Sequence, residues 1–101
     1  MPRPLNFHQE WIDPILSGRK RVTVRRAGSG YRRGDHVKAM RRNHPSFADL
    51  KIDRVESVRL DELTGRHARL DGHRDVESLR NAVAGLYPGE DEFDVISFRL
   101  A

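Results

Sequence analysis

The stretch Gly18-Arg19-Lys20-Arg21-Val22-Thr23-Val24-Arg25 organises the interpretation of the whole chain. Its β-branched residues 22–24 predict a strand, and Gly18 is typical of the position just past a helix. A strand alternates its faces, so two valines are expected on one side and Arg21, Thr23 and Arg25 on the other. One lysine, one threonine and three arginines within eight residues predict the floor of a small, cationic ligand pocket.

The segment before this stretch has helical spacing. Phe7, Trp11 and Ile15 recur every four residues, which predicts one face of a helix. Pro14 either kinks that helix or starts a new turn, because proline lacks the amide hydrogen that an interior position needs. Trp11 is expected in the core, with stacking on a bound base as the alternative.

The segments after it predict further strands and two helices. Residues 26–30 read as a loop and 33–35 as a turn. Strands are expected around residues 37–39, over 48–52 with a bulge near 55–58, and over 96–100. A helix over 62–70 with Asp61 as its N-cap, and one over 76–86 capped by Asp75, complete the prediction. This inventory of about five strands predicts an α+β fold, a small and mostly antiparallel β-barrel with flanking helices.

Composition sets further bounds. The 101 residues predict a single domain over residues 1–101, and the 25 Leu, Ile, Val and Phe residues suffice for a folded core. The absence of cysteine excludes disulfides, thiolate catalysis and cysteine-ligated zinc. No apolar run is long enough for a membrane span and the N-terminus lacks a secretory pattern, so a cytoplasmic protein is expected. The spacing of the five histidines fits no metal motif, and neither a metal nor a cofactor is expected.

The charge is divided unevenly along the chain. Residues 1–45 hold eleven Lys/Arg and three Asp/Glu, whereas residues 46–101 hold eight and twelve. A basic N-terminal half favours a phosphate-bearing partner such as RNA, although solvated arginines alone would also produce this split.

The octet resembles the G-x-K-x-x-[E/T]-x-R signature of the ASCH domain family, whose fold is a PUA-like barrel. Residues 15–18, 34–35, 60–64, 67–68, 86–89 and 95–98 extend this resemblance over nearly the whole chain. It is closest to the short bacterial members that hydrolyse N4-acetylcytidine to cytidine and acetate, which share the threonine at the position of Thr23. The resemblance implies a metal-free amidohydrolase of N4-acetylcytidine or related N4-acylated cytosines, with Lys20, Thr23 and a carboxylate as the catalytic trio. The carboxylate falls by spacing on Asp71, where the family has glutamate, with Glu62 and Glu77 as competing candidates.

The chemistry sets a geometric condition. A threonine hydroxyl becomes a nucleophile when a base lies within hydrogen-bond reach, and a lysine serves as that base when it is neutral. Burial and neighbouring cations lower a lysine pKa, and Arg19, Arg21 and Arg25 are the candidate cations. These arginines and Trp11 are also the predicted substrate-binding residues, with Arg25 a donor to the carbonyl oxygen.

Residues three apart on a regular strand face opposite ways. Lys20 and Thr23 therefore converge only if Lys20 still belongs to the turn after Gly18, or if a bulge intervenes. The alternative function is an RNA-binding module, with weak ribonuclease activity as a variant of it.

Overall fold

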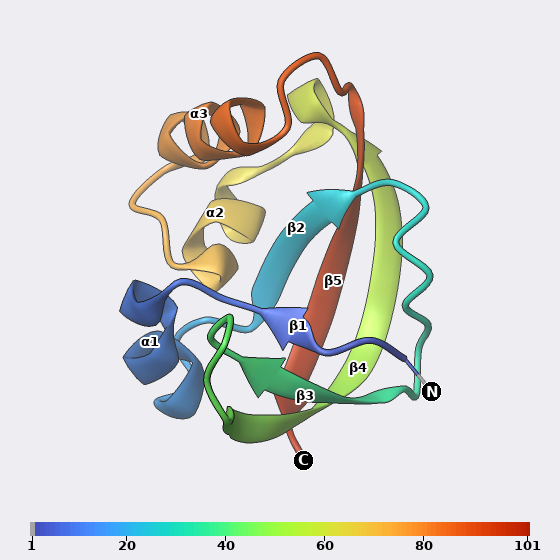
Figure 1. The fold of residues 1–101 in the computed structure, drawn as a ribbon. Coiled ribbons are helices and arrows are strands. Elements are labelled where there is room, and N and C mark those ends of the chain that lie inside the picture. The colour runs from blue at the N-terminus through green and yellow to red at the C-terminus, as the bar shows by residue number, and fades with distance from the viewer. Residues whose placement is uncertain (1) are drawn as a thin grey trace.

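The computed structural model describes residues 2–101 and contains one five-stranded sheet curved into a half-barrel, with three α-helices beside it (Figure 1). The strand order is β1-β3-β4-β5-β2, in which β1 pairs parallel with β3 and every other pair is antiparallel. The strands are β1 (Leu5–Asn6), β2 (Val22–Arg26), β3 (His36–Met40), β4 (Ser46–Arg59) and β5 (Glu92–Leu100). The predicted α+β, mostly antiparallel fold is confirmed. The sheet remains open between its edge strands, β1 and β2.

Strands β4 and β5 form the longest pair in the sheet. Their pairing shifts register between Ile52 and Arg54, so the predicted bulge is present but lies before residues 55–58, near which the sequence placed it. The 14-residue β4 passes through this bend and so serves both ends of the sheet.

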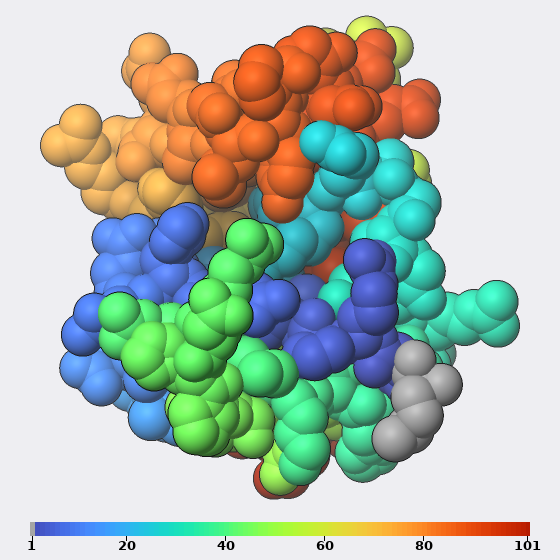
Figure 2. Space-filling model, viewed as in Figure 1, coloured from blue at the N-terminus to red at the C-terminus, as the bar shows by residue number. Residues whose placement is uncertain are grey.

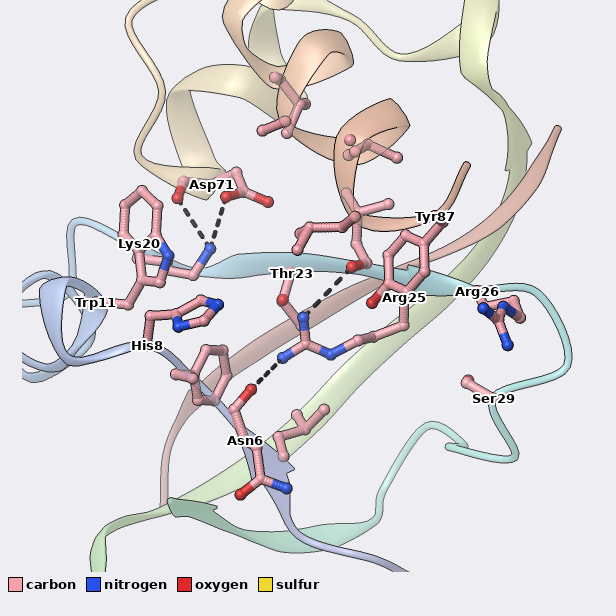
Figure 3. Close-up of a pocket in the computed structure, with 18 of the residues that line it drawn as sticks. Asn6, His8, Trp11, Lys20, Thr23, Arg25, Arg26, Ser29, Asp71 and Tyr87 are labelled. Carbon is pink, nitrogen blue, oxygen red and sulfur yellow. Dashed lines mark hydrogen bonds and ion pairs between the residues drawn. The ribbon is translucent and has the colours of Figure 1, made fainter. Parts of the chain in front are cut away.

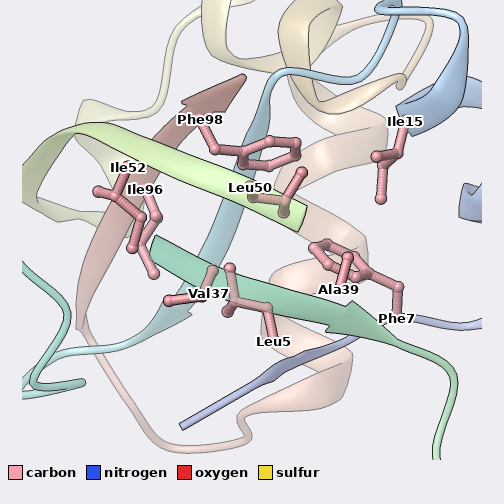
Figure 4. Packing of buried hydrophobic residues seen from close by; sticks show 9 residues of the cluster. All are labelled: Leu5, Phe7, Ile15, Val37, Ala39, Leu50, Ile52, Ile96 and Phe98. Atoms are coloured by element: carbon pink, nitrogen blue, oxygen red, sulfur yellow. The ribbon is translucent and has the colours of Figure 1, made fainter. Parts of the chain in front are cut away.

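Two hydrophobic clusters fill the interior. The first lies where β1, β3, β4 and β5 curve around Ile15 (Figure 4), and consists of Leu5, Phe7, Ile15, Val37, Ala39, Leu50, Ile52, Ile96 and Phe98. The second lies between the sheet and the helices α2 (Gly65–Asp71) and α3 (Val76–Leu86), and consists of Val22, Val24, Val58, Leu63, Ala68, Leu79, Val83, Phe93 and Val95. Val22 and Val24 thus share the face that their spacing predicts.

The predicted N-terminal helix is only partly correct. Its residues form a 3-10 turn, η1 (Gln9–Trp11), followed by the short α1 (Ile12–Leu16). Phe7 precedes both in extended backbone, where its N–H donates to the Met40 carbonyl at 2.7 Å. Phe7 therefore matches the helical spacing although it is a buried residue outside the helix. Gly18, with φ +81°, follows the helix as predicted.

The predicted helix over 62–70 is misplaced. Residues Leu60–Glu62 form the 3-10 turn η2, and α2 begins only at Gly65. Its N-cap is Thr64, whose hydroxyl accepts from the His67 N–H, and not Asp61. The N-cap at Asp75 is confirmed, because its carboxylate accepts from the Ser78 N–H at 2.8 Å. Within residues 2–101 no helix is long and apolar enough to cross a membrane.

Candidate active site

A groove opens at the gap between the two edge strands. Its walls come from the N-terminal segment through Trp11, from Lys20 and residues 23–29, and from α3, and Figure 2 shows the hollow beside α3. Its volume is about 1460 Å³, above the roughly 300–1,000 Å³ of a typical small-molecule pocket. The groove as a whole is therefore larger than the small pocket that the sequence predicts, because an unclosed half-barrel leaves a long opening.

Arg25 bridges that opening. Its guanidinium donates to the Asn6 carbonyl on β1 at 2.7 Å and to the Val24 carbonyl at 3.4 Å. It also lies over the Phe7 ring, 5.2 Å from its centre. Since Arg25 belongs to β2 and Asn6 to β1, one side chain joins the two edges of the sheet across the groove floor (Figure 3).

Lys20 satisfies the geometric condition that the sequence set. It lies in the segment between α1 and β2, which begins only at Val22. Its backbone N–H donates to the Pro14 carbonyl at 3.0 Å, which fixes the chain as it leaves the turn after Gly18. The side chains of Lys20 and Thr23 consequently both line the groove (Figure 3).

The Lys20 amine lies in a set of three acceptors. It donates to the Val22 carbonyl at 3.0 Å, to the Asp71 carbonyl at 2.9 Å and to Asp71 Oδ1 at 2.6 Å. Three acceptors match the three hydrogens of an ammonium, and the Trp11 ring centre lies 4.6 Å from the nitrogen. Lys20 is 3% exposed and Asp71 5% exposed, so the pair is nearly dry.

Burial lowers the pKa of Lys20 below its ordinary value, because the charged form loses its hydration. Asp71 opposes this shift through its charge and hydrogen bond, and Arg25 adds to it. Arg19 and Arg21 do not contribute to the shift, contrary to the expectation that all three arginines would.

Thr23 is 2% exposed as a residue and sits in β2 opposite Ile96 of β5. Within residues 2–101 its hydroxyl has no hydrogen-bonded side-chain or backbone partner as donor or acceptor. In Figure 3 the hydroxyl points into the groove beside the Arg25 guanidinium. Thr23 and Lys20 share the cavity without being hydrogen-bonded to each other.

The turn after α2 supports the buried pair. Gly72 ends the helix with φ +96°, the left-handed conformation that glycine adopts without strain. A Cβ at Gly72 would lie 2.8 Å from Trp11 Cζ3, so the indole packs directly on this turn. His73 then packs against Trp11 with ring centres 5.6 Å apart and planes tilted by 49°, and its Nε2 lies 3.6 Å from Asp71 Oδ1.

The structure brings five of the predicted site residues together: Trp11, Lys20, Thr23, Arg25 and Asp71. It does not bring Arg19 or Arg21, which are exposed and outside the groove lining. Both flank Lys20 in sequence, and a buried Lys20 side chain sends its neighbours outward.

Of the competing carboxylates, neither Glu62 nor Glu77 lines the groove. Glu62 instead accepts from the Arg59 N–H at 2.7 Å as part of the η2 cap. Asp71 is thus the carboxylate that reaches Lys20.

Two groove contributors escaped the sequence reasoning. His73 was weighed only as a metal ligand, although its position beside Asp71 and Gly72 offered a signal. The Asn6 carbonyl gave no signal, since a backbone acceptor carries no residue type. Among the described residues, no group of three or more His, Asp or Glu is arranged to hold a metal ion.

Two relatives of this chain carry the same name. A protein of Citrobacter koseri named N(4)-acetylcytidine amidohydrolase is 33% identical over 100 residues, covering 97% of this chain and 96% of its own. A Haemophilus influenzae protein of the same name is 34% identical over 101 residues, covering 98% and 96%. No protein-family model matches the chain.

Solved structures share the fold at low identity. An ASCH domain from Lactobacillus crispatus superposes with a TM-score of 0.72 at 15% identity, over 97% of this chain and 77% of that one. The ASCH protein of Zymomonas mobilis gives a TM-score of 0.76 at 13% identity, over 97% and 67%. The half-barrel described above is therefore the ASCH fold.

Proposed function

Because the chain belongs to the N(4)-acetylcytidine amidohydrolase family, we propose that it hydrolyses N4-acetylcytidine to cytidine and acetate. One observation carries the proposal beyond the relatives' name. A dry lysine–aspartate pair and an unpaired threonine hydroxyl line the same groove, at the gap where a ligand has access to both. Such an arrangement supplies the base and the nucleophile that deacylation of an amide needs.

Arg25 and Trp11 serve binding in this proposal. Arg25 uses two backbone carbonyls to hold its guanidinium in place, and a guanidinium has five N–H donors. The remaining donors face the groove and suit the acetyl oxygen, which becomes an oxyanion during attack. Trp11 lines the groove beside Lys20, and its indole is the surface against which the cytosine ring packs in this proposal.

The base forms by proton transfer within the buried pair. At 2.6 Å and out of water, Asp71 accepts one proton from the Lys20 ammonium, which leaves a carboxylic acid and a neutral amine. The amine then turns its lone pair from the Asp71 acid to the Thr23 hydroxyl, which donates to it, while its two N–H groups keep the Val22 and Asp71 carbonyls as acceptors. This rotation turns the resting arrangement into the reactive one.

The acyl transfer proceeds in two halves. Thr23 Oγ1 attacks the acetyl carbon while Lys20 takes its proton, and Arg25 stabilises the oxyanion. The carbon–N4 bond breaks as Lys20 returns that proton to N4, which releases cytidine and leaves an acetyl ester on Thr23. Water then attacks the ester while Lys20 takes one of its protons and passes it to Thr23 Oγ1; the ester bond breaks, and acetic acid leaves and loses its remaining proton to solvent as acetate. Asp71 finally returns its proton to Lys20.

Incubation of the purified protein with N4-acetylcytidine, followed by chromatography, tests the activity. We expect stoichiometric cytidine and acetate, and a loss of about 10²–10⁴-fold in kcat for Lys20→Ala. Thr23→Val keeps the shape of the side chain but removes the hydroxyl, and should be comparably inactive. It should also form no acetyl-protein, whereas a rapidly quenched wild-type reaction should show an added acetyl group by mass spectrometry.

Lys51→Ala, a lysine on the far segment of β4 outside the groove lining, is the matched control and should keep full activity. An unchanged N4-acetylcytidine after long incubation would defeat the proposal. Full activity in Thr23→Val would leave the hydrolase standing but replace threonine by water as the nucleophile.

RNA binding stays the alternative prediction. The observation that favours it is the groove lining, which holds six Lys/Arg and two Asp/Glu. A filter-binding titration of single-stranded RNA at rising salt discriminates the two: affinity that falls steeply with salt, with N4-acetylcytidine left intact, favours a binding module.

A further inference from the structure

The groove extends well past the buried pair, toward the turn that joins β3 to β4. Arg41 and Arg42 line it there, directly after the last residue of β3. The volume of about 1460 Å³ leaves this part free when a nucleoside occupies the region around Lys20 and Thr23. What this second part of the groove accepts is set by its charge.

The other basic residues of the groove already have acceptors or anions. Lys20 is held by Asp71, Arg25 by two carbonyls, Arg3 by the Ser29 carbonyl at 2.9 Å, and Arg26 by Glu90 at 3.4 Å. Among residues 2–101, the Arg41 and Arg42 side chains make no ion pair and no hydrogen bond with the protein. Arg41 is moreover half-buried, which makes an unpaired guanidinium more costly there than at the open surface.

The backbone places this pair at a definite distance from the reacting groups. The Asn6 carbonyl that accepts from Arg25 belongs to the register partner of Met40, and the Phe7 N–H is bonded to the Met40 carbonyl. Arg41 is the next residue along. Adjacent strands lie about 4.8 Å apart and consecutive Cα atoms 3.8 Å apart; with the 2.7 Å hydrogen bond and roughly 2.4 Å from Cα to carbonyl oxygen, the Arg41 Cα lies at most about 14 Å from the Arg25 guanidinium. A long arginine side chain covers a large part of that span, so its guanidinium can meet the phosphate on the ribose of a base held near Arg25.

The turn holds the two arginines in place. The His44 N–H donates to the Arg41 carbonyl at 2.9 Å, and Asn43 takes φ +64°, a left-handed conformation that closes the turn. Two adjacent guanidinium groups on a closed turn provide several N–H donors to a tetrahedral anion, which is the usual recognition of phosphate by arginine.

We propose that Arg41 and Arg42 form a phosphate subsite, and that the groove takes the 5′-phosphorylated form of an N4-acylated cytidine in preference to the bare nucleoside. The proposal rests on the proposed function for the base-binding end. Its own content is the phosphate contact, whether the phosphate belongs to a mononucleotide or to an RNA chain.

The test compares kcat/KM for N4-acetylcytidine, for its 5′-monophosphate, and for a short oligoribonucleotide with one N4-acetylcytidine. We expect the monophosphate to exceed the nucleoside about tenfold, the contribution of roughly one charge-assisted hydrogen bond, mainly through KM. The double variant Arg41→Ala/Arg42→Ala should bring this ratio to about one. The oligonucleotide arm shows whether a chain phosphate is accepted in place of a terminal one.

Arg32 and Arg33 offer a matched control. They too are adjacent arginines on a turn, exposed and outside the groove lining, so Arg32→Ala/Arg33→Ala changes the net charge equally. This variant should keep the tenfold ratio. An equal kcat/KM for nucleoside and monophosphate in the wild type, or a ratio that survives in the Arg41/Arg42 variant, would overturn the subsite.

Binding measurements separate this proposal from the activity. If N4-acetylcytidine is not hydrolysed, calorimetric titrations with cytidine 5′-monophosphate and with cytidine still report the phosphate contact. Tighter binding of the monophosphate, lost in the Arg41/Arg42 variant and weakened by salt, supports the subsite without the hydrolase. Equal affinities would reject it whatever the outcome for catalysis.

Discussion

The Lys20–Asp71 and Lys38–Asp49 pairs join the same two kinds of side chain over nearly the same distance, 2.6 Å and 2.5 Å. Their surroundings are opposite. The Lys20 and Asp71 side chains are 3% and 8% exposed, whereas those of Lys38 and Asp49 are 60% and 61% exposed. Lys38 on β3 lies opposite Asp49 on β4, and both side chains are in open solvent. Distance alone therefore does not distinguish a reactive pair from an ordinary surface pair.

What differs is the cost of charge. Water solvates the exposed pair whether or not it is formed, so its contribution to stability is small. In the buried pair, the Lys20 amine has two backbone carbonyls, the Asp71 carboxylate and an indole face around it in place of water. In that environment burial lowers the pKa of Lys20, so the neutral amine is less costly relative to the ammonium than it is in water. Burial, rather than pairing, is what distinguishes the proposed catalytic pair from the surface pair.

Replacing the lysine of each pair should give the largest difference in stability between the two. Lys20→Met leaves the Asp71 carboxylate buried without a cation, and we expect the free energy of unfolding to fall by about 3–5 kcal/mol. Lys38→Met should change it by at most about 1 kcal/mol. Urea denaturation at pH 7 measures both.

The double variant Lys20→Met/Asp71→Leu is the control for the cause of that loss. It removes both charges, and it should recover most of the stability while remaining inactive, because an apolar replacement of a buried pair is often neutral. A loss in Lys20→Met no larger than in Lys38→Met would mean that water reaches Asp71.

The turn behind the buried pair offers a smaller perturbation. Gly72 and Gly18 both have positive φ, +96° and +81°, so alanine is strained at either. Only at Gly72 would the new Cβ meet another residue, Trp11 Cζ3 at 2.8 Å. Gly72→Ala should thus cost about 1–3 kcal/mol more than Gly18→Ala, through crowding.

Trp11 reports that displacement directly, because it is the only tryptophan of the chain. Its fluorescence emission should shift in Gly72→Ala and stay unchanged in Gly18→Ala. Identical spectra and identical stabilities in the two variants would show that the indole does not pack on the turn as described.

Sequence patterns predicted the elements that local rules determine. The alternation in β5, the N-cap at Asp75 and the left-handed glycine after the helix at Gly18 each depend on a few neighbouring residues. Strand β1 has only two residues, and its pairing with β3 depends on the curvature of the whole sheet, so no local period marked it.

The site divides in the same way. Lys20 and Thr23 followed from the motif, and Asp71 followed from spacing within the family resemblance. The groove behind them could not be predicted from the sequence, because it lies in the gap between β1 and β2, two edge strands that do not pair with each other. For the same reason nothing in the sequence singled out Arg41 and Arg42, which line the groove. Arg19 and Arg21, which the motif favoured as site residues, lie outside the lining.

The smallest effect is a dependence of stability on pH. The pKa of Lys20 in the folded protein lies below its unfolded value of 10.5, mainly because burial penalises the charge. Between the lowered pKa and 10.5 the unfolded chain binds more protons than the folded one, so the free energy of unfolding rises with pH in that window. Below the lowered pKa both states are protonated, and the cost of burying the ammonium remains in full.

The difference in unfolding free energy between the wild type and Lys20→Met/Asp71→Leu isolates this contribution, since the other titrating groups are common to both. Measured by urea denaturation from pH 7 to 10.5, it should move in favour of the wild type as the pH rises. A difference that moves the other way would mean that Asp71 raises the pKa of Lys20 more than burial lowers it. Lys20 would then stay an ammonium throughout the reaction, and the proposed base would have to be a different group.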